Sequence, residues 1–171
     1  KKGLPFVLLK AALTLDGKVA APSGDARWIS SEASRRVAHA YRQWLPAVMV
    51  GVGTVLKDDP ALTVREPDFR PFPLMVEPPP LRDPLKVVLD TEARTPPTAR
   101  LFRKGPRGEP ARVLVFVGEG APRARVSALE EAGARVVALP REGGRVDPER
   151  ALAFLLEEGV GLWEWRYPFP L

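Results

Sequence analysis

Apolar residues along the chain gather into short runs that alternate with amphipathic stretches. Four runs rich in β-branched residues have the length and composition of buried strands, and they lie at 47–52, 86–90, 113–118 and 135–139. Three stretches repeat apolar residues at helical spacing, and they lie near 32–44, 121–134 and 147–159. A further apolar run at 6–15 predicts another buried strand, interrupted only by Lys10. Strands that alternate with helices predict an α/β fold with a largely parallel sheet.

Polar residues, prolines and glycines mark the boundaries of these elements. Ser30 or Ser31 is placed to cap the first helix, and Pro46 follows its end. Glycines close the two later helices. The segment 66–84, EPDFRPFPLMVEPPPLRDP, is rich in proline and predicts a surface loop.

Composition narrows the classes of function. The 171 residues are enough for one substantial domain. The absence of cysteine excludes disulfides and thiolate metal sites, and His39, the one histidine, leaves little for a zinc site or a serine triad, so no metal site is expected. No apolar run is long enough to span a membrane, and a cytoplasmic protein is the simplest interpretation. The net charge of +5 is spread among alternating acids and bases, which favours small anionic ligands over nucleic acid.

The stretch 50–65, VGVGTVLKDDPALTVR, carries the first chemical signal. Leu56 stands where a dinucleotide fingerprint has its third glycine, and no Gly-Lys-Thr follows, so neither common nucleotide motif is present. Gly51 and Gly53 would let the backbone approach a ligand, and Thr54 is placed to cap a short helix that must stop before Pro60. The alternative is a plain βα turn with solvated acids.

Each of the other candidate site residues has a functional and a purely structural interpretation. A lysine inside an apolar strand is costly unless it is paired or used, so Lys10 is either a functional cation or an edge-strand residue that reaches water. Arg42 and Arg65 are candidate phosphate ligands, although most arginines in so basic a chain are solvated. His39 fits a helix surface better than a base. Trp28 is either a pocket wall or part of the core.

Taken together, five pieces in this order resemble one family: KAALTLDGKVA, SGDARWIS, HAYR, VMVGVGTVLKDDPALTVR and KVVLDTEARTP. The chain resembles the reductase domain of riboflavin biosynthesis, most clearly over residues 5–97. The resemblance implies a dihydrofolate-reductase-like three-layer α/β sandwich with a mixed, mostly parallel sheet. It also implies NADPH-dependent reduction of the ribosyl group of 5-amino-6-(5-phosphoribosylamino)uracil to the ribitylamino product.

The resemblance assigns roles to individual positions. The positions that would contact NADPH are Ala12, Trp28, Thr54, Asp58 and Thr91. The positions that would contact the phosphoribosylamino-pyrimidine substrate are Ala26, Arg42, Leu62 and Arg65. Lys10 would lie beside the reacting sugar, and Lys10 and Asp58 would manage the proton and hydroxyl geometry at its C1.

Two departures from the family bear on these expectations. No zinc-deaminase signature is present, so a deaminase domain would belong elsewhere in the same chain or to another chain. After LLEEGVG the tail reads LWEWRYPFPL, so residues 1–171 are expected to form a single reductase domain without the family's final strands and helix. A homodimer is also expected. The alternatives are a non-catalytic binding or assembly domain of the same fold, a pteridine-type reductase, and a nucleic-acid module.

Overall fold

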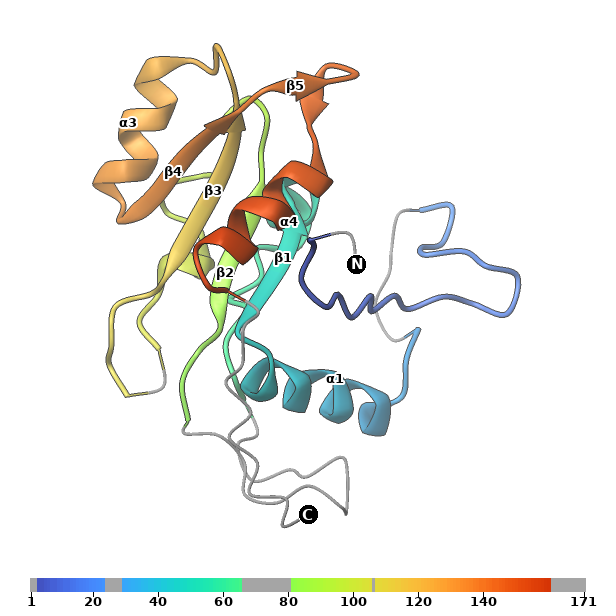
Figure 1. Cartoon of the computed structure of the whole chain (residues 1–171). Helices are drawn as coiled ribbons and strands as arrows, with labels where there is room; N and C mark the ends of the chain where they lie inside the picture. The colour runs from blue at the N-terminus through green and yellow to red at the C-terminus, as the bar shows by residue number, and fades with distance from the viewer. Residues whose placement is uncertain (1–2, 24–28, 66–80, 106, 161–171) are drawn as a thin grey trace.

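A parallel four-stranded sheet forms the centre of the protein (Figure 1). The computed structural model describes residues 3–23, 29–65, 81–105 and 107–160. The strands lie side by side in chain order, as β1 (Ala47–Gly51), β2 (Leu85–Leu89), β3 (Val113–Gly118) and β4 (Ala134–Leu139). The predictions for these four strands, and for a largely parallel sheet, are confirmed.

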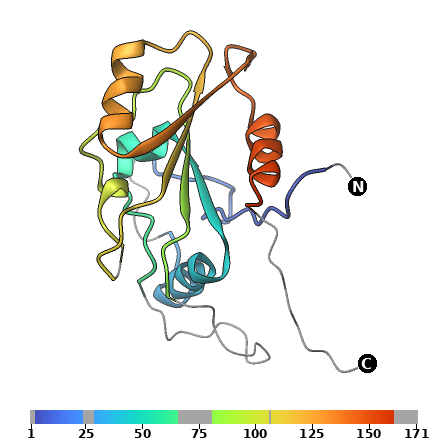
Figure 2. The same cartoon turned by 60° about the vertical axis from the view of Figure 1, so that its left-hand side comes forward.

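Helices cover both faces of the sheet, which gives three layers (Figure 2). On one face lie α2 (Val52–Asp58), the short 3₁₀ helix η1 (Arg100–Phe102) and α3 (Arg123–Glu131). Each of these three elements connects one parallel strand to the next strand in the sheet. Because the connections between parallel strands are right-handed and the strands follow one another in chain order, all three connections lie on the same face. The last helix, α4 (Pro148–Glu157), packs on the opposite face.

The alternation of side chains along the strands divides the core into two clusters. Val88 and Val115 face α2 and α3, where they pack with Val55 and Leu129. The neighbouring strand positions point to the other face and meet α4 through Ala151 and Leu155, in a cluster that includes Val87, Leu114 and Phe116. Every residue of β3 is buried, because β3 is central and covered on both sides.

Local sequence signals explain where the helices begin. In α1 (Glu32–Trp44), Ser31 is the cap, and its hydroxyl accepts a hydrogen bond from the Ser34 N–H at 3.2 Å. In α4, Asp147 accepts from the Glu149 N–H at 2.9 Å, and a proline occupies the first helical position. The helices predicted near 32–44, 121–134 and 147–159 are therefore confirmed, with α3 shorter than its sequence pattern.

A small antiparallel hairpin between β4 and α4 was not predicted. Its strands are β5 (Arg141–Glu142) and β6 (Arg145–Val146), and Gly143 and Gly144 join them with φ of 56° and 77°. Two consecutive residues with positive φ match the tight turn that suits the twist of a hairpin. The hairpin lies beyond the carboxyl ends of the sheet strands (Figure 1).

The strand predicted at 6–15 is wrong. These residues form no strand, and large side chains such as Phe6 and Leu9 are 82% and 89% exposed. A strand needs a ladder partner for its backbone groups, and β1 pairs only with β2 among the described residues. The hydrogen bonds that shape this region are those of a local turn, in which Thr14 meets Lys18 and Gly17.

Two smaller expectations are also corrected. Thr54 does not cap α2, because the helix starts directly after β1 with Gly51 as its cap residue. Asp83 was included in the predicted surface loop, but it is buried next to the start of β2. Residues 66–80 of that proline-rich loop lie outside the described residues.

Candidate functional site

Arg42 and Arg65 lie close enough to affect one another. Arg42 is half-buried in the last turn of α1, and its Nη1 donates to the Thr63 carbonyl oxygen at 3.2 Å. Burial lowers the pKa of the Arg42 guanidinium, the positive charge of Arg65 lowers it further, and Asp83 opposes both effects. Guanidinium groups bind phosphate and carboxylate oxygens in bidentate geometry, so the positive charges of these two arginines suit an anionic ligand.

His39 takes part in this arrangement as a hydrogen-bond partner. Arg42 Nη1 lies 3.1 Å from the Nδ1 atom of His39, one helical turn earlier. A guanidinium can only donate, so Nδ1 accepts, and the proton of a neutral imidazole is assigned to Nε2. The expected solvated surface histidine is therefore half-buried and helps to orient Arg42.

The loop 59–65, between α2 and the proline-rich segment, carries Leu62 and Arg65. Its backbone visits the left-handed region at Asp59 and Leu62, with φ of 39° and 53°. Asp59 Oδ1 accepts from the Arg100 N–H at 2.8 Å, which ties the loop to η1. Leu62 is buried in the core, while Arg65 is exposed. The loop therefore buries its apolar residue and leaves the cation of Arg65 in reach of solvent.

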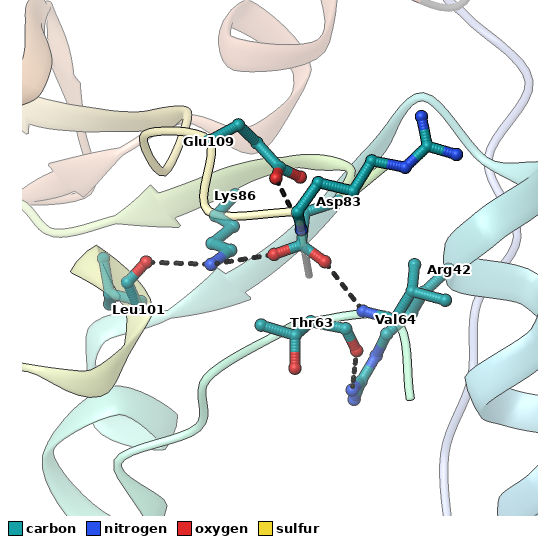
Figure 3. Close-up of polar contacts among 8 residues, drawn as sticks. Arg42, Thr63, Val64, Asp83, Lys86, Leu101 and Glu109 are labelled. Carbon is teal, nitrogen blue, oxygen red and sulfur yellow. Dashed lines mark hydrogen bonds and ion pairs between the residues drawn. The ribbon is translucent and has the colours of Figure 1, made fainter. Parts of the chain in front are cut away.

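A buried ion pair between Lys86 and Asp83 is connected to the loop 59–65 (Figure 3). Lys86, the second residue of β2, is fully buried, and its Nζ lies 3.5 Å from Asp83 Oδ2 and donates to the Leu101 carbonyl oxygen at 3.0 Å. The other Asp83 oxygen, Oδ1, accepts from the Val64 N–H at 2.8 Å. Burial lowers the pKa of Lys86, and the negative charges of Asp83 and then Glu109 oppose that change.

The sequence carries a signal for the buried Lys86 that matches the signal for Lys10. Lys86 opens the apolar run KVVLD, so it is a lysine in a buried strand, which is the pattern that drew attention to Lys10. The two lysines prove to be opposites, because Lys86 is buried and paired whereas Lys10 is exposed.

Lys10 and Ala12 border a hollow of about 520 Å³ between residues 8–13 and α1. Ser34, Val37, Ala38 and Tyr41 form the α1 side of the hollow. Tyr41 is adjacent to Arg42 in sequence, but Arg42 does not line the hollow. Lys10 therefore lies at the hollow beside α1, whereas Arg42, in the last turn of the same helix, does not line it.

Thr54, Asp58 and Thr91 belong to another part of the site. Gly51 pairs with Leu89, so the start of α2 and the segment after β2 lie at the same carboxyl edge of the sheet. Thr54 and Asp58 are exposed and are four residues apart, which puts them on one face of α2. Open parallel sheets bind ligands at this edge.

The hydroxyl group of Thr91 accepts one hydrogen bond and can still donate another. Its Oγ1 accepts from the Val146 N–H at 3.1 Å, so it holds the hairpin onto the edge of the sheet. The hydroxyl hydrogen is free to donate to a further partner. Arg141 strengthens the attachment, because it donates to the Glu119 carbonyl oxygen at 2.9 Å and pairs with the Glu92 carboxylate.

The predicted residues thus fall into three groups. Arg42, Leu62 and Arg65 are brought together at the end of α1, Lys10 and Ala12 at the hollow, and Thr54, Asp58 and Thr91 along α2 and the sheet edge. Ala26 and Trp28 lie outside the described residues. In the described part of the chain there is no group of three or more His, Cys, Asp or Glu that could hold a metal ion. None of the described helices is long and apolar enough to cross a membrane.

Comparisons with known proteins identify relatives over most of the chain. The model of the RibD C-terminal domain family matches residues 5–162. Riboflavin biosynthesis protein RibD of Bacillus amyloliquefaciens is 36% identical over 160 residues, which cover 94% of this chain and 38% of that protein. A 2,5-diamino-6-ribosylamino-4(3H)-pyrimidinone 5′-phosphate reductase of Methanothermobacter thermautotrophicus is 40% identical over 160 residues, covering 92% of this chain and 64% of that protein.

A solved structure has the same fold. The deaminase/5-amino-6-(5-phosphoribosylamino)uracil reductase of Thermotoga maritima superposes with a TM-score of 0.63 at 33% identity, covering 94% of this chain and 38% of that one. The three-layer sandwich with a parallel sheet is therefore the dihydrofolate-reductase-like fold of these reductases. The chain spans 38% and 64% of the lengths of the two relatives compared above. With the family's model matched over nearly the whole sequence, the chain belongs to the RibD C-terminal domain family.

Proposed function

We propose that this chain reduces the ribosyl group of a phosphoribosylamino-pyrimidine to the ribityl group in riboflavin biosynthesis, with NADPH as the reductant. Membership of a family whose relatives include named reductases supports the reaction class. The observation that carries the substrate assignment is the location of two guanidinium groups at the loop 59–65, where Arg42 donates to the Thr63 carbonyl oxygen and Arg65 lies two residues further along and is exposed. A phosphate dianion relieves the repulsion between two guanidinium groups and accepts hydrogen bonds from both.

The residues of the carboxyl edge fit a dinucleotide. Gly51 and Gly53 border open space, so a ligand can approach the backbone closely there. Thr54 is exposed, and Thr91 keeps a hydroxyl hydrogen to donate, which suits phosphate and ribose oxygens. In this proposal Thr54 and Thr91, with Ala12, Trp28 and Asp58, hold NADPH, which supplies a hydride when bound.

The side chains of this protein would orient the sugar and handle its protons. Arg42 and Arg65 are proposed to hold the phosphate end, with Ala26 as a further substrate contact, whereas the buried Leu62 would shape the loop from inside the core. Reduction of the open-chain imine at C1 needs one proton in addition to the hydride, and Lys10 and Asp58 are the groups proposed to order the proton and hydroxyl positions. The exposed position of Asp58, four residues after Thr54, suits a role between cofactor and sugar.

The test is a spectrophotometric assay of NADPH oxidation at 340 nm with the purified chain. Both the 2,5-diamino-pyrimidinone phosphate and the corresponding uracil are offered, which also identifies the preferred base. Asp58→Asn is expected to lower kcat by about 10²-fold or more, which is far more than it weakens binding of NADPH. Glu130→Gln, a change at an exposed carboxylate of α3, serves as the control and should leave kcat unchanged. An unaltered rate in Asp58→Asn removes that residue from the mechanism.

The homodimer and the deaminase partner belong to the same proposal. Phe6, Leu9 and Leu15 are exposed apolar side chains on one short segment, and such surfaces mark sites of association. The Thermotoga relative is titled as both deaminase and reductase, which supports a deaminase domain working with this one. Sedimentation velocity of the parent chain and of Leu9→Asp would show a dimer that the substitution dissociates, whereas a monomeric parent chain rejects the dimer.

A further inference from the structure

Asp83 joins two parts of the protein that are distant in sequence. One oxygen, Oδ2, faces the ammonium of Lys86 at 3.5 Å, inside the core at the start of β2. The other, Oδ1, accepts from the Val64 N–H at 2.8 Å in the loop that follows α2. Asp83 and Lys86 are 7% and 0% exposed, so water does not compete for either contact (Figure 3).

The residues on both sides of Val64 are those that bring the arginines together. Thr63 precedes it, and the Thr63 carbonyl oxygen accepts from Arg42 Nη1 at 3.2 Å. Arg65 follows it and is directed to solvent, close enough to lower the pKa of Arg42. Fixing the Val64 amide therefore fixes both the acceptor that orients Arg42 and the backbone that carries Arg65.

Lys86 holds Asp83 in turn. Its Nζ is anchored by the Leu101 carbonyl oxygen at 3.0 Å, and its position on β2 is set by the sheet register with Val48 and Val113. A buried ion pair adds little net stability compared with apolar residues of similar size, but it restricts the geometry of the groups that it joins. The sheet, Lys86, Asp83 and the Val64 amide form one rigid connection.

We propose that Asp83, held by Lys86, is a positioning residue of the phosphate site, which sets the loop 59–65 so that Arg42 and Arg65 converge on the substrate phosphate. This inference rests on the proposed function, in which those two arginines bind the phosphate. Asp83 itself does not touch the substrate, because its oxygens are turned toward Lys86 and Val64.

A matched pair of double variants isolates the hydrogen bond to Val64. Asp83→Asn/Lys86→Met removes both charges but keeps an oxygen for the Val64 N–H. Asp83→Leu/Lys86→Met has nearly the same side-chain volumes and lacks that oxygen. Neither variant leaves an unpaired charge in the core, so both are expected to fold. If circular dichroism shows that the leucine variant does not fold, Asp83→Ser/Lys86→Met replaces it, because the serine side chain is too short for its oxygen to reach the Val64 N–H.

The probes are ribose 5-phosphate and ribose, with Kd measured by calorimetry, and the pyrimidine phosphate substrate, with kcat and KM measured separately. Asp83→Leu/Lys86→Met should raise both the Kd for ribose 5-phosphate and KM about tenfold, with kcat and the Kd for NADPH within about twofold. Asp83→Asn/Lys86→Met should restore both values to within about twofold of the parent chain. Leu129→Ala, a core change on α3, controls for lost stability and should leave the Kd for ribose 5-phosphate unchanged.

The outcomes separate the two proposals. A parent chain that binds ribose 5-phosphate no better than ribose has no phosphate site, which overturns the proposed function and this inference with it. A parent chain that prefers ribose 5-phosphate, with equal affinity in the leucine and asparagine variants, keeps the phosphate site and overturns only the positioning role. Weakening of both variants to the same degree also overturns it, because the effect would then come from the ion pair rather than from the bond to Val64.

Discussion

One hydroxyl oxygen makes a central contribution to the attachment of the β5–β6 hairpin to the sheet edge. Thr91 Oγ1 accepts from the N–H of Val146, a residue that is only 5% exposed, so water has poor access to that amide. Thr91→Val keeps the shape of the side chain and removes the acceptor. A buried donor left without a partner costs about 1–3 kcal/mol. With an m-value of about 2 kcal/mol per molar urea, the unfolding midpoint should fall by about 0.5–1.5 M.

Urea unfolding followed by circular dichroism measures this loss, and amide hydrogen exchange locates it. Exchange of the Val146 amide should accelerate in Thr91→Val more than exchange of amides in β3, because the hairpin opens locally. Thr98→Val provides the control, since Thr98 is exposed, and its free energy of unfolding should change by less than about 0.5 kcal/mol. A Thr91→Val protein with the parent midpoint and unchanged Val146 protection would show that the hairpin is held by other contacts.

Two further predictions concern other buried positions of the sheet. Gly118→Ala should destabilise the protein by about 1–3 kcal/mol, because the new Cβ would lie 2.6 Å from Arg141 Nε and 2.9 Å from Thr91 Cγ2. Urea unfolding measures this loss against Gly53→Ala, where the new Cβ meets no atom within 4 Å and the backbone is helical. Burial lowers the pKa of Lys86 in the folded protein, so the folded protein releases this proton at a lower pH than the unfolded chain does. The stability due to Lys86 is therefore complete above the ordinary lysine pKa, and it is lost as pH falls through the lowered pKa of the folded state. The free energy of unfolding of the parent chain should therefore rise relative to Asp83→Asn/Lys86→Met as pH increases through the alkaline range, and a constant difference would contradict burial as the main cause.

The strands and helices were predictable because each one satisfies its own local pattern. The run 113–118 is apolar throughout, as a central strand covered on both faces must be, and it is found as β3 at the predicted bounds. Ser31 and Asp147 carry their capping role in the side chain itself, so the helix starts can be read without tertiary information. The hairpin was not predicted because β5 and β6 have two residues each and Val146 is their one apolar residue, which leaves no strand pattern, and Gly143–Gly144 was its one signal.

The error at residues 6–15 has a different origin. The apolar composition of a segment indicates that it favours burial, but it does not indicate whether a neighbouring strand is present to pair with its backbone. The buried lysine could not be told from the exposed one for the same reason. Lys10 and Lys86 both interrupt apolar runs, and only the tertiary structure supplies Asp83 and the Leu101 carbonyl to one of them.

The course of α2 relates the separate groups of candidate residues to the dimensions of the proposed substrate. The helix starts at the carboxyl edge beside Thr54 and leads into the loop that carries Arg65, so it runs between the expected cofactor site and the arginines. A helix rises 1.5 Å per residue, so Thr54 and Asp58 are about 6 Å apart along its axis. An open-chain pentose phosphate has its reacting C1 at one end and its phosphate at the other, and it needs a site that is elongated in this way. Asp58, after Thr54 and before the loop, would then face the sugar between those two ends. A compact substrate without a phosphate would leave the positive charges of Arg42 and Arg65 without an anion, which is why we propose the phosphoribosyl compound rather than a pteridine.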